Sequence, residues 1–84
     1  MITAVIFDRD GTLIEHVPYL SKISEVTLFP CVLEACQLLK DRGIKIFIAT
    51  NQSGIGRGFY SEDDYQIVER YIERLFESNG VFIE

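Results

Sequence analysis

The sequence predicts an α/β domain built on a parallel β-sheet with flanking helices. Short apolar runs rich in β-branched and aromatic residues occur at 3–7, 44–49 and 81–84, and such runs are typical of buried strands. Two stretches with helical spacing of apolar residues, 31–42 and 62–78, lie between them. Because strands separated by helices of this length are almost always parallel with right-handed crossovers, we expect one parallel sheet.

The composition limits the classes of protein to consider. A chain of 84 residues makes a single small domain or a piece of a larger one. The formal charge of -5, with no basic stripe, argues against nucleic acid as a partner. No apolar run approaches the roughly 20 residues of a membrane span, and the first residues lack the basic start and cleavage site of a signal peptide. We therefore expect a cytoplasmic protein with no membrane partner.

The first strand and the segment after it have different characters. Residues 3–7, "TAVIF", are nearly all apolar, so we expect this strand to be covered on both faces. Residues 15–29 follow an irregular pattern with Pro18 and several hydroxyl residues. This segment is interpreted as a long loop or a small flap, and in a compact domain such length tends to be functional.

The first helix has recognisable ends. Pro30 suits a first helical position, and Gly43 suits a left-handed residue that closes the helix. The positions predicted to share its buried face are Val32, Ala35, Cys36 and Leu39. Cys31 and Cys36 are five residues apart and match no metal spacing, so they are interpreted as small hydrophobic residues.

The second helix begins with a capping box. Ser61 is followed three residues later by Asp64, and Asn79 with Gly80 ends the pattern. The apolar positions predicted to form its core face are Tyr65, Val68, Ile72, Leu75 and Phe76. The acidic positions beside them, Glu69, Glu73 and Glu77, are interpreted as a solvated face.

Two polar motifs follow the first two predicted strands. The carboxyl ends of parallel strands meet at one edge of a sheet, so "DRDGT" and "TNQSG" should face each other across a crevice. If the extended geometry persists, Asp8 and Asp10 point the same way and Arg9 is turned aside. Two close carboxylates need a cation, and Mg²⁺ prefers oxygen ligands. The other interpretation of this motif is turn chemistry with no ligand.

The second motif supplies groups suited to an anion. Thr50 and Asn51 offer a hydroxyl and an amide, and the glycines after them can present backbone N–H groups. Arg57 is the cation placed to meet a phosphate or a carboxylate there. An ordinary connecting loop and a solvated surface arginine are the alternatives.

These residues carry a resemblance to a known family. "FDRDGTLI", "LFPCVLEACQLLKDRGIKIFIATNQSGIGRG" and "FYSEDDY" are similar to sequences of the haloacid dehalogenase (HAD) superfamily. The similarity is greatest to its histidinol-phosphate and heptose-bisphosphate phosphatase branch. It implies a Rossmann-like sheet of which residues 1–84 form the N-terminal portion, with a flap insertion near 15–29.

The resemblance also implies roles for single residues. Asp8 would be the nucleophile that takes the phosphoryl group, and Asp10 would protonate the leaving oxygen and then activate water. Mg²⁺ would be held by the Asp8 carboxylate and the Asp10 backbone carbonyl. Thr50 and Asn51 would bind the phosphoryl oxygens of a small phosphorylated metabolite, either a sugar phosphate or histidinol phosphate.

Some groups of the family pattern would lie beyond Glu84. They are a lysine, an acidic pair and, in many members of this branch, a zinc-binding cysteine loop. The alternative function is therefore a non-catalytic or vestigial module that binds magnesium and phosphate. A phospho-acceptor receiver domain fits less well, because the DxDGT motif is not the receiver arrangement of acids.

The first predicted strand raises a packing question. In the family's fold this strand lies in the middle of the sheet, flanked on its far side by strands that these 84 residues do not contain. A bare apolar edge invites pairing with another chain. We therefore expect either that these residues belong to a longer phosphatase or that they self-associate through this edge.

Overall fold

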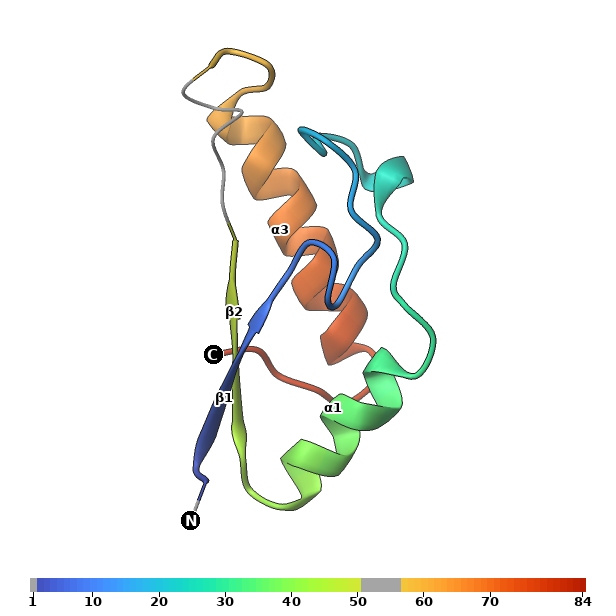
Figure 1. Ribbon diagram of the computed structural model, residues 1–84, viewed down its shortest axis with the longest axis vertical. Helices are drawn as coiled ribbons and strands as arrows, with labels where there is room; N and C mark the ends of the chain where they lie inside the picture. The colour runs from blue at the N-terminus through green and yellow to red at the C-terminus, as the bar shows by residue number, and fades with distance from the viewer. Residues whose placement is uncertain (1, 51–56) are drawn as a thin grey trace.

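The fold is described from a computed structural model, which places residues 2–50 and 57–84 (Figure 1). The elements in chain order are β1 (Ala4–Asp8), a short 3-10 helix η1 (Ile23–Glu25), α1 (Val32–Asp41), β2 (Lys45–Ala49) and α3 (Glu62–Glu77). The order of strands and helices confirms the predicted α/β class. The predictions for Asn51 lie outside the described residues.

The sheet consists of two parallel strands. β1 pairs with β2 from Ala4 opposite Lys45 to Asp8 opposite Ala49. The predicted third strand at 81–84 is wrong as a strand, because its pairing is a single parallel bridge between Ile46 and Ile83. The bridge is parallel, which is the direction predicted for this segment. One physical reason is that the Val81 N–H donates to the Phe76 carbonyl at 3.0 Å and closes the end of α3, so it does not extend the ladder.

The two faces of the sheet differ in cover. The face with Phe7 and Ile46 packs against the core, whereas Ile6 and Phe47, which are opposite each other in the register, are 71% and 37% exposed. Figure 1 shows α1 and α3 on the same side of the sheet. The prediction that the first strand is covered on both faces is therefore wrong for these residues. The reason is that successive right-handed crossovers in one direction place their helices on one face.

The core lies between the sheet, the helices and the flap segment. Its fully buried apolar side chains are those of Leu13, Ile14, Leu20, Cys36, Ile46, Val68, Ile72, Phe76 and Val81. The flap segment is tied down: Ile14 bridges Leu28, and the Glu15 N–H donates to the Thr27 carbonyl at 2.8 Å. With buried Leu20, the segment contributes to the core as well as covering α3 (Figure 1).

Helix α1 begins later than predicted. Pro30 is not its first residue, because Cys31 adopts a left-handed conformation (φ 67°) and the helix starts at Val32. Gly43 has the predicted left-handed conformation (φ 73°), and its N–H donates to the Lys40 carbonyl at 2.9 Å. Cys36 is buried as expected, whereas Cys31 is exposed.

Helix α3 confirms the predicted capping box. The Ser61 hydroxyl accepts from the Asp64 N–H, and the Asp64 carboxylate accepts from the Ser61 N–H, both at 3.1 Å. The buried side chains of the helix are Val68, Ile72 and Phe76. None of the helices in the described part of the chain is long and apolar enough to cross a membrane.

Candidate functional site

The turn after β1 is fixed at both ends by backbone hydrogen bonds. The Arg9 N–H donates to the Ala49 carbonyl at 2.9 Å, which ties the turn to the end of β2. The Arg9 carbonyl accepts from the N–H groups of Leu13 and Ile14, at 3.0 and 3.1 Å. Gly11 has φ 85°, a conformation that side chains with a Cβ rarely adopt. The backbone of the DxD motif is therefore held rigidly beside β2.

The two aspartates of the motif lie in different surroundings. β1 ends at Asp8, which is exposed, and Asp10 is half-buried within the turn. Arg9 lies between them and is only 2% exposed. Arg9 is buried whereas Asp8 is exposed, as alternation along a strand predicts, but Arg9 is not turned away from Asp10, because its guanidinium bonds both Asp10 carboxylate oxygens.

Thr50, the described residue of the second motif, meets the first motif at the end of β1, as the parallel order requires. The Thr50 hydroxyl donates to the Asp10 carboxylate (Oγ1 to Oδ2) at 2.9 Å, although the two residues are 40 positions apart. Asp8 is opposite Ala49 in the register, so Thr50 directly follows the partner of Asp8. The structure thus brings Asp8, Asp10 and Thr50 to one edge of the sheet.

Arg9 joins Asp10 to helix α3. Its Nε and Nη2 donate to the two Asp10 carboxylate oxygens, each at 3.1 Å, and its Nη1 donates to Glu69 Oε1. Burial lowers the pKa of Arg9, but the hydrogen bonds and charges of Asp10 and Glu69 raise it, and the balance lies above the ordinary value. The guanidinium therefore remains charged at any physiological pH.

Glu69 corrects a prediction from sequence. It is not part of a purely solvated face, because its side chain is only 23% exposed and pairs with Arg9. Helical spacing contained the signal: Glu69 lies four residues after half-buried Tyr65 and three before buried Ile72. An acidic residue on the inner side of a helix calls for a cationic partner.

The remaining predicted phosphate ligand lies near the flap segment. Arg57 is exposed, and its Nη1 donates to the Tyr19 hydroxyl at 2.9 Å. The Tyr19 ring contacts the Phe59 ring, with centroids 4.3 Å apart. These contacts join the segment 15–29 to the residues before α3. Arg57 is thereby held at the flap segment, with its guanidinium exposed.

The acidic groups fit a hard divalent cation only in part. Across residues 2–50 and 57–84, no three His, Cys, Asp or Glu side chains gather closely enough to hold a metal ion. Asp8 and Asp10 supply carboxylate oxygens, the donor type that Mg²⁺ prefers, and Mg²⁺ usually binds one or two carboxylates together with waters and phosphate oxygens. The residues present therefore fit part of a magnesium site.

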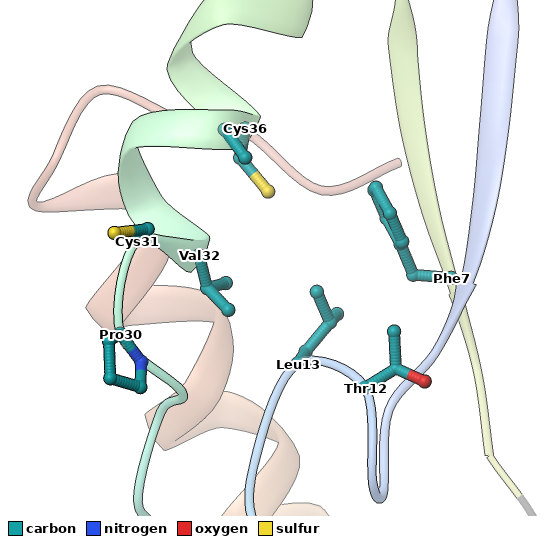
Figure 2. Close-up of a pocket in the computed structure, with 8 residues that line it drawn as sticks. Phe7, Thr12, Leu13, Pro30, Cys31, Val32 and Cys36 are labelled. Atoms are coloured by element: carbon teal, nitrogen blue, oxygen red, sulfur yellow. The ribbon is translucent and has the colours of Figure 1, made fainter.

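A cavity of about 310 Å³ lies behind the DxD turn (Figure 2). Phe7, Thr12 and Leu13 line it from the strand and turn, and Val32 and Cys36 point toward it from α1. No charged side chain lines it. An apolar cavity cannot solvate a phosphate, so it is not the site for the charged part of a substrate.

Comparison with known proteins finds relatives that share one kind of name. No protein-family model matches the chain. A D-glycero-β-D-manno-heptose-1,7-bisphosphate 7-phosphatase of Pasteurella multocida is 36% identical over 85 residues, covering 100% of this chain and 46% of the relative. The chain spans about half the length of the curated relatives it matches, for example 52% and 45%.

Two solved structures share the fold. A protein of Mesorhizobium loti, described as a HAD-like phosphatase, has a TM-score of 0.87 at 34% identity and covers 98% of this chain and 39% of its own. In sequence and in fold the chain is similar to this HAD-like phosphatase. A D,D-heptose 1,7-bisphosphate phosphatase of B. bronchiseptica, complexed with magnesium and phosphate, has a TM-score of 0.89 at 24% identity, over 98% of this chain and 46% of its own. Its likeness to this chain is one of fold.

Proposed function

We propose that this chain contributes the nucleophile and the acid–base group of a magnesium-dependent phosphatase that acts on a small phosphorylated sugar. The observation that carries the proposal is the contact between Asp10 and Thr50, which places the ends of two parallel strands at one polar edge. The names of the relatives support the same chemistry, since they are heptose bisphosphate phosphatases.

The chemistry proceeds in two steps. A carboxylate oxygen of Asp8 forms a bond to phosphorus, the bond from phosphorus to the sugar oxygen breaks, and the Asp10 proton passes to that oxygen. Water then attacks the aspartyl-phosphate, gives its proton to Asp10 and releases inorganic phosphate, which restores Asp8. In this proposal the Thr50 hydroxyl, which donates to Asp10 in the structure, turns to a phosphoryl oxygen when substrate binds. Asn51 holds the phosphoryl oxygens with it, and exposed Arg57 meets a further anionic group of the substrate.

Local charge supports a divalent cation. The side chains of Asp8, Asp10 and Glu69 are acidic and that of Arg9 is basic, so these four groups sum to two negative charges when all are ionised. In this proposal a bound Mg²⁺ would offset part of this negative charge and would help to neutralise the phosphoryl group. The Asp8 carboxylate and the Asp10 backbone carbonyl are the proposed ligands. The magnesium and phosphate bound by the B. bronchiseptica protein favour the same cofactor.

The substrate class follows from the relatives rather than from the geometry. They are named for both the α and the β anomer of heptose 1,7-bisphosphate, so the proposal is a heptose bisphosphate of either anomer. Histidinol phosphate is the alternative substrate from the sequence resemblance. Measuring phosphate release by the complete protein from the two heptose bisphosphates and histidinol phosphate in parallel decides between them.

Asp8→Asn in the complete protein tests the nucleophile. The amide cannot form the aspartyl-phosphate, so we expect kcat to fall by at least about a thousandfold, with the thermal unfolding midpoint little changed because Asp8 is exposed. Asp41→Asn, which alters an exposed aspartate at the end of α1, is the matched control and should keep full activity. Retained turnover in the Asp8 variant would refute the assignment.

A second candidate function is a module that binds magnesium and phosphate without turnover. It is favoured by the two hydrogen bonds of Arg9 to Asp10, which engage both oxygens of the proposed acid–base group. Calorimetric titration of the 84-residue chain with Mg²⁺ and inorganic phosphate measures this binding directly. Heat of binding without any hydrolysis by the complete protein supports the module, and hydrolysis by the complete protein excludes it.

A further inference from the structure

Arg9 is the only buried charged residue in the described part of the chain. It lies between two exposed or half-buried aspartates, and its guanidinium makes three hydrogen bonds to carboxylate oxygens. Taking a charged group out of water costs several kcal/mol unless good partners compensate it. A buried arginine inside a site motif, with most of its bonds directed at a single acid of that motif, calls for a functional explanation.

Three side-chain hydrogen bonds from two residues restrict the Asp10 carboxyl. Nε and Nη2 of Arg9 reach both of its oxygens, which sets the plane of the carboxyl group. The Thr50 hydroxyl adds a further bond to Oδ2. Among the described residues, Oδ2 thus accepts two side-chain hydrogen bonds and Oδ1 accepts one. Within these residues Oδ1 accepts fewer side-chain hydrogen bonds than Oδ2, so we assign proton transfer to Oδ1.

Glu69 restricts Arg9 in turn. Its carboxylate accepts from Nη1, the guanidinium nitrogen that Asp10 does not use, and it comes from α3, 60 residues away in sequence. The Arg9 backbone is itself held by bonds to Ala49, Leu13 and Ile14. A chain of contacts thus runs from the body of the helix through the guanidinium to the Asp10 carboxyl.

We propose that Arg9 and Glu69 are positioning residues, which hold the Asp10 carboxyl in the orientation needed to give its proton to the leaving oxygen. This inference rests on the proposed phosphatase function. It adds that Glu69, on the inner side of α3, influences proton donation by Asp10. Glu69 acts through Arg9 rather than by contact with substrate or metal. The planar, forked guanidinium of Arg9 contacts both Asp10 carboxylate oxygens at once, and a lysine ammonium cannot reproduce this geometry.

The test separates proton donation from every other step. An alkyl phosphate such as a sugar phosphate needs a proton on its leaving oxygen, whereas p-nitrophenyl phosphate has a stable leaving anion and needs little help. The parameter kcat/KM reports steps through release of the first product, so it is insensitive to later hydrolysis of the aspartyl-phosphate. The ratio of kcat/KM for the two substrates, measured on the complete protein, therefore reports the acid step.

Glu69→Ala should lower kcat/KM for the sugar phosphate about tenfold more than for p-nitrophenyl phosphate. This loss is smaller than the rate enhancement of roughly 10²–10⁴ that a general acid supplies, because the variant misplaces the acid and does not remove it. Glu69→Gln keeps an acceptor oxygen for Nη1 and should restore most of the loss. Glu73→Ala, which changes an exposed glutamate one turn further along α3, should leave the ratio unchanged. A purely structural role for Glu69 predicts equal losses on both substrates, and that result would overturn the proposal.

Arg9→Lys makes the test independent of whether Glu69→Ala folds. It keeps the positive charge and removes the fork, so we expect the same selective loss on the sugar phosphate. Equal losses on both substrates would overturn the positioning role, while the proposed function would stand. If the unaltered complete protein hydrolyses neither substrate with Mg²⁺, the proposed function itself fails, and the positioning role fails with it.

Discussion

At the scale of single residues, the burial of Cys36 makes the stability of the fold depend on pH. Its thiol is 1% exposed, and burial raises its pKa above the ordinary value of 9.0. Burial also raises the pKa of Tyr60 and Tyr65 above the ordinary value of 10.0. In each case the folded protein keeps a proton that the unfolded chain has already lost, so stability is complete below the ordinary pKa and falls as pH rises through the raised one.

We therefore expect the free energy of unfolding to decline with pH from about 9, first through Cys36 and then through the tyrosines. Cys36→Ala should remove the first part of this decline, while Cys31→Ala, at an exposed position, should keep it. Urea unfolding under reducing conditions, repeated from pH 7 to about pH 10, measures how the free energy of unfolding of each cysteine variant changes with pH. An unchanged slope in the Cys36 variant would contradict the burial argument.

The residues of the candidate site differ in how far sequence could predict them. The meeting of Asp10 with Thr50 follows from parallel strand order, because the ends of adjacent strands share an edge whatever the side chains do. The burial of Arg9 follows from alternation along the strand, since Arg9 comes two residues after core-facing Phe7, but its hydrogen bonds to the neighbouring Asp10 do not follow from it. Its partner Glu69 was detectable only as an acid on the inner side of a helix.

At the scale of elements, the start of α3 depends on a reciprocal pair of hydrogen bonds. Ser61 and Asp64 satisfy two N–H groups that the helix itself leaves without partners. The helix presents both the core residue Val68 and the site residue Glu69, so weakening its first turns also loosens the support of the candidate site.

Ser61→Ala should lower the free energy of unfolding by about 1 kcal/mol, the usual cost of losing such a cap. For a chain of this size that corresponds to a fall of about 4–8 °C in the midpoint of thermal unfolding. Ser24→Ala, at an exposed position within η1, is the matched control and should change stability by less than about 0.5 kcal/mol. Equal midpoints for the two variants would show that the cap contributes nothing.

The elements were more predictable than their ends. Helical spacing and the capping box located α3 to within a residue, because both signals are local. Pro30 was misleading, since a first-position proline is a preference and the left-handed Cys31 delays the helix. The run at 81–84 has strand composition, but a strand also needs a continuous ladder, and here only Ile83 is bridged to Ile46.

At the scale of the whole molecule, one face of the sheet is left uncovered by residues 2–50 and 57–84. Ile6 and Phe47 lie opposite each other on the face away from α1 and α3, and Phe82 is 60% exposed on the segment next to β2. β1 also has a neighbour along only one of its edges in the described residues (Figure 1). An apolar face beside an unpaired strand edge favours association with another chain.

We expect the 84-residue chain to self-associate through this face at micromolar concentrations. Ile6→Lys places a charge in its centre and should shift the chain toward the monomer mass of 9.6 kDa in sedimentation experiments. Ile67→Lys replaces an isoleucine on α3 that is 55% exposed and lies outside the sheet, so it should leave association unchanged. The comparison separates the sheet face from exposed apolar area in general. A chain that sediments as a monomer at high concentration without any substitution would contradict the prediction, as would equal effects of the two lysines.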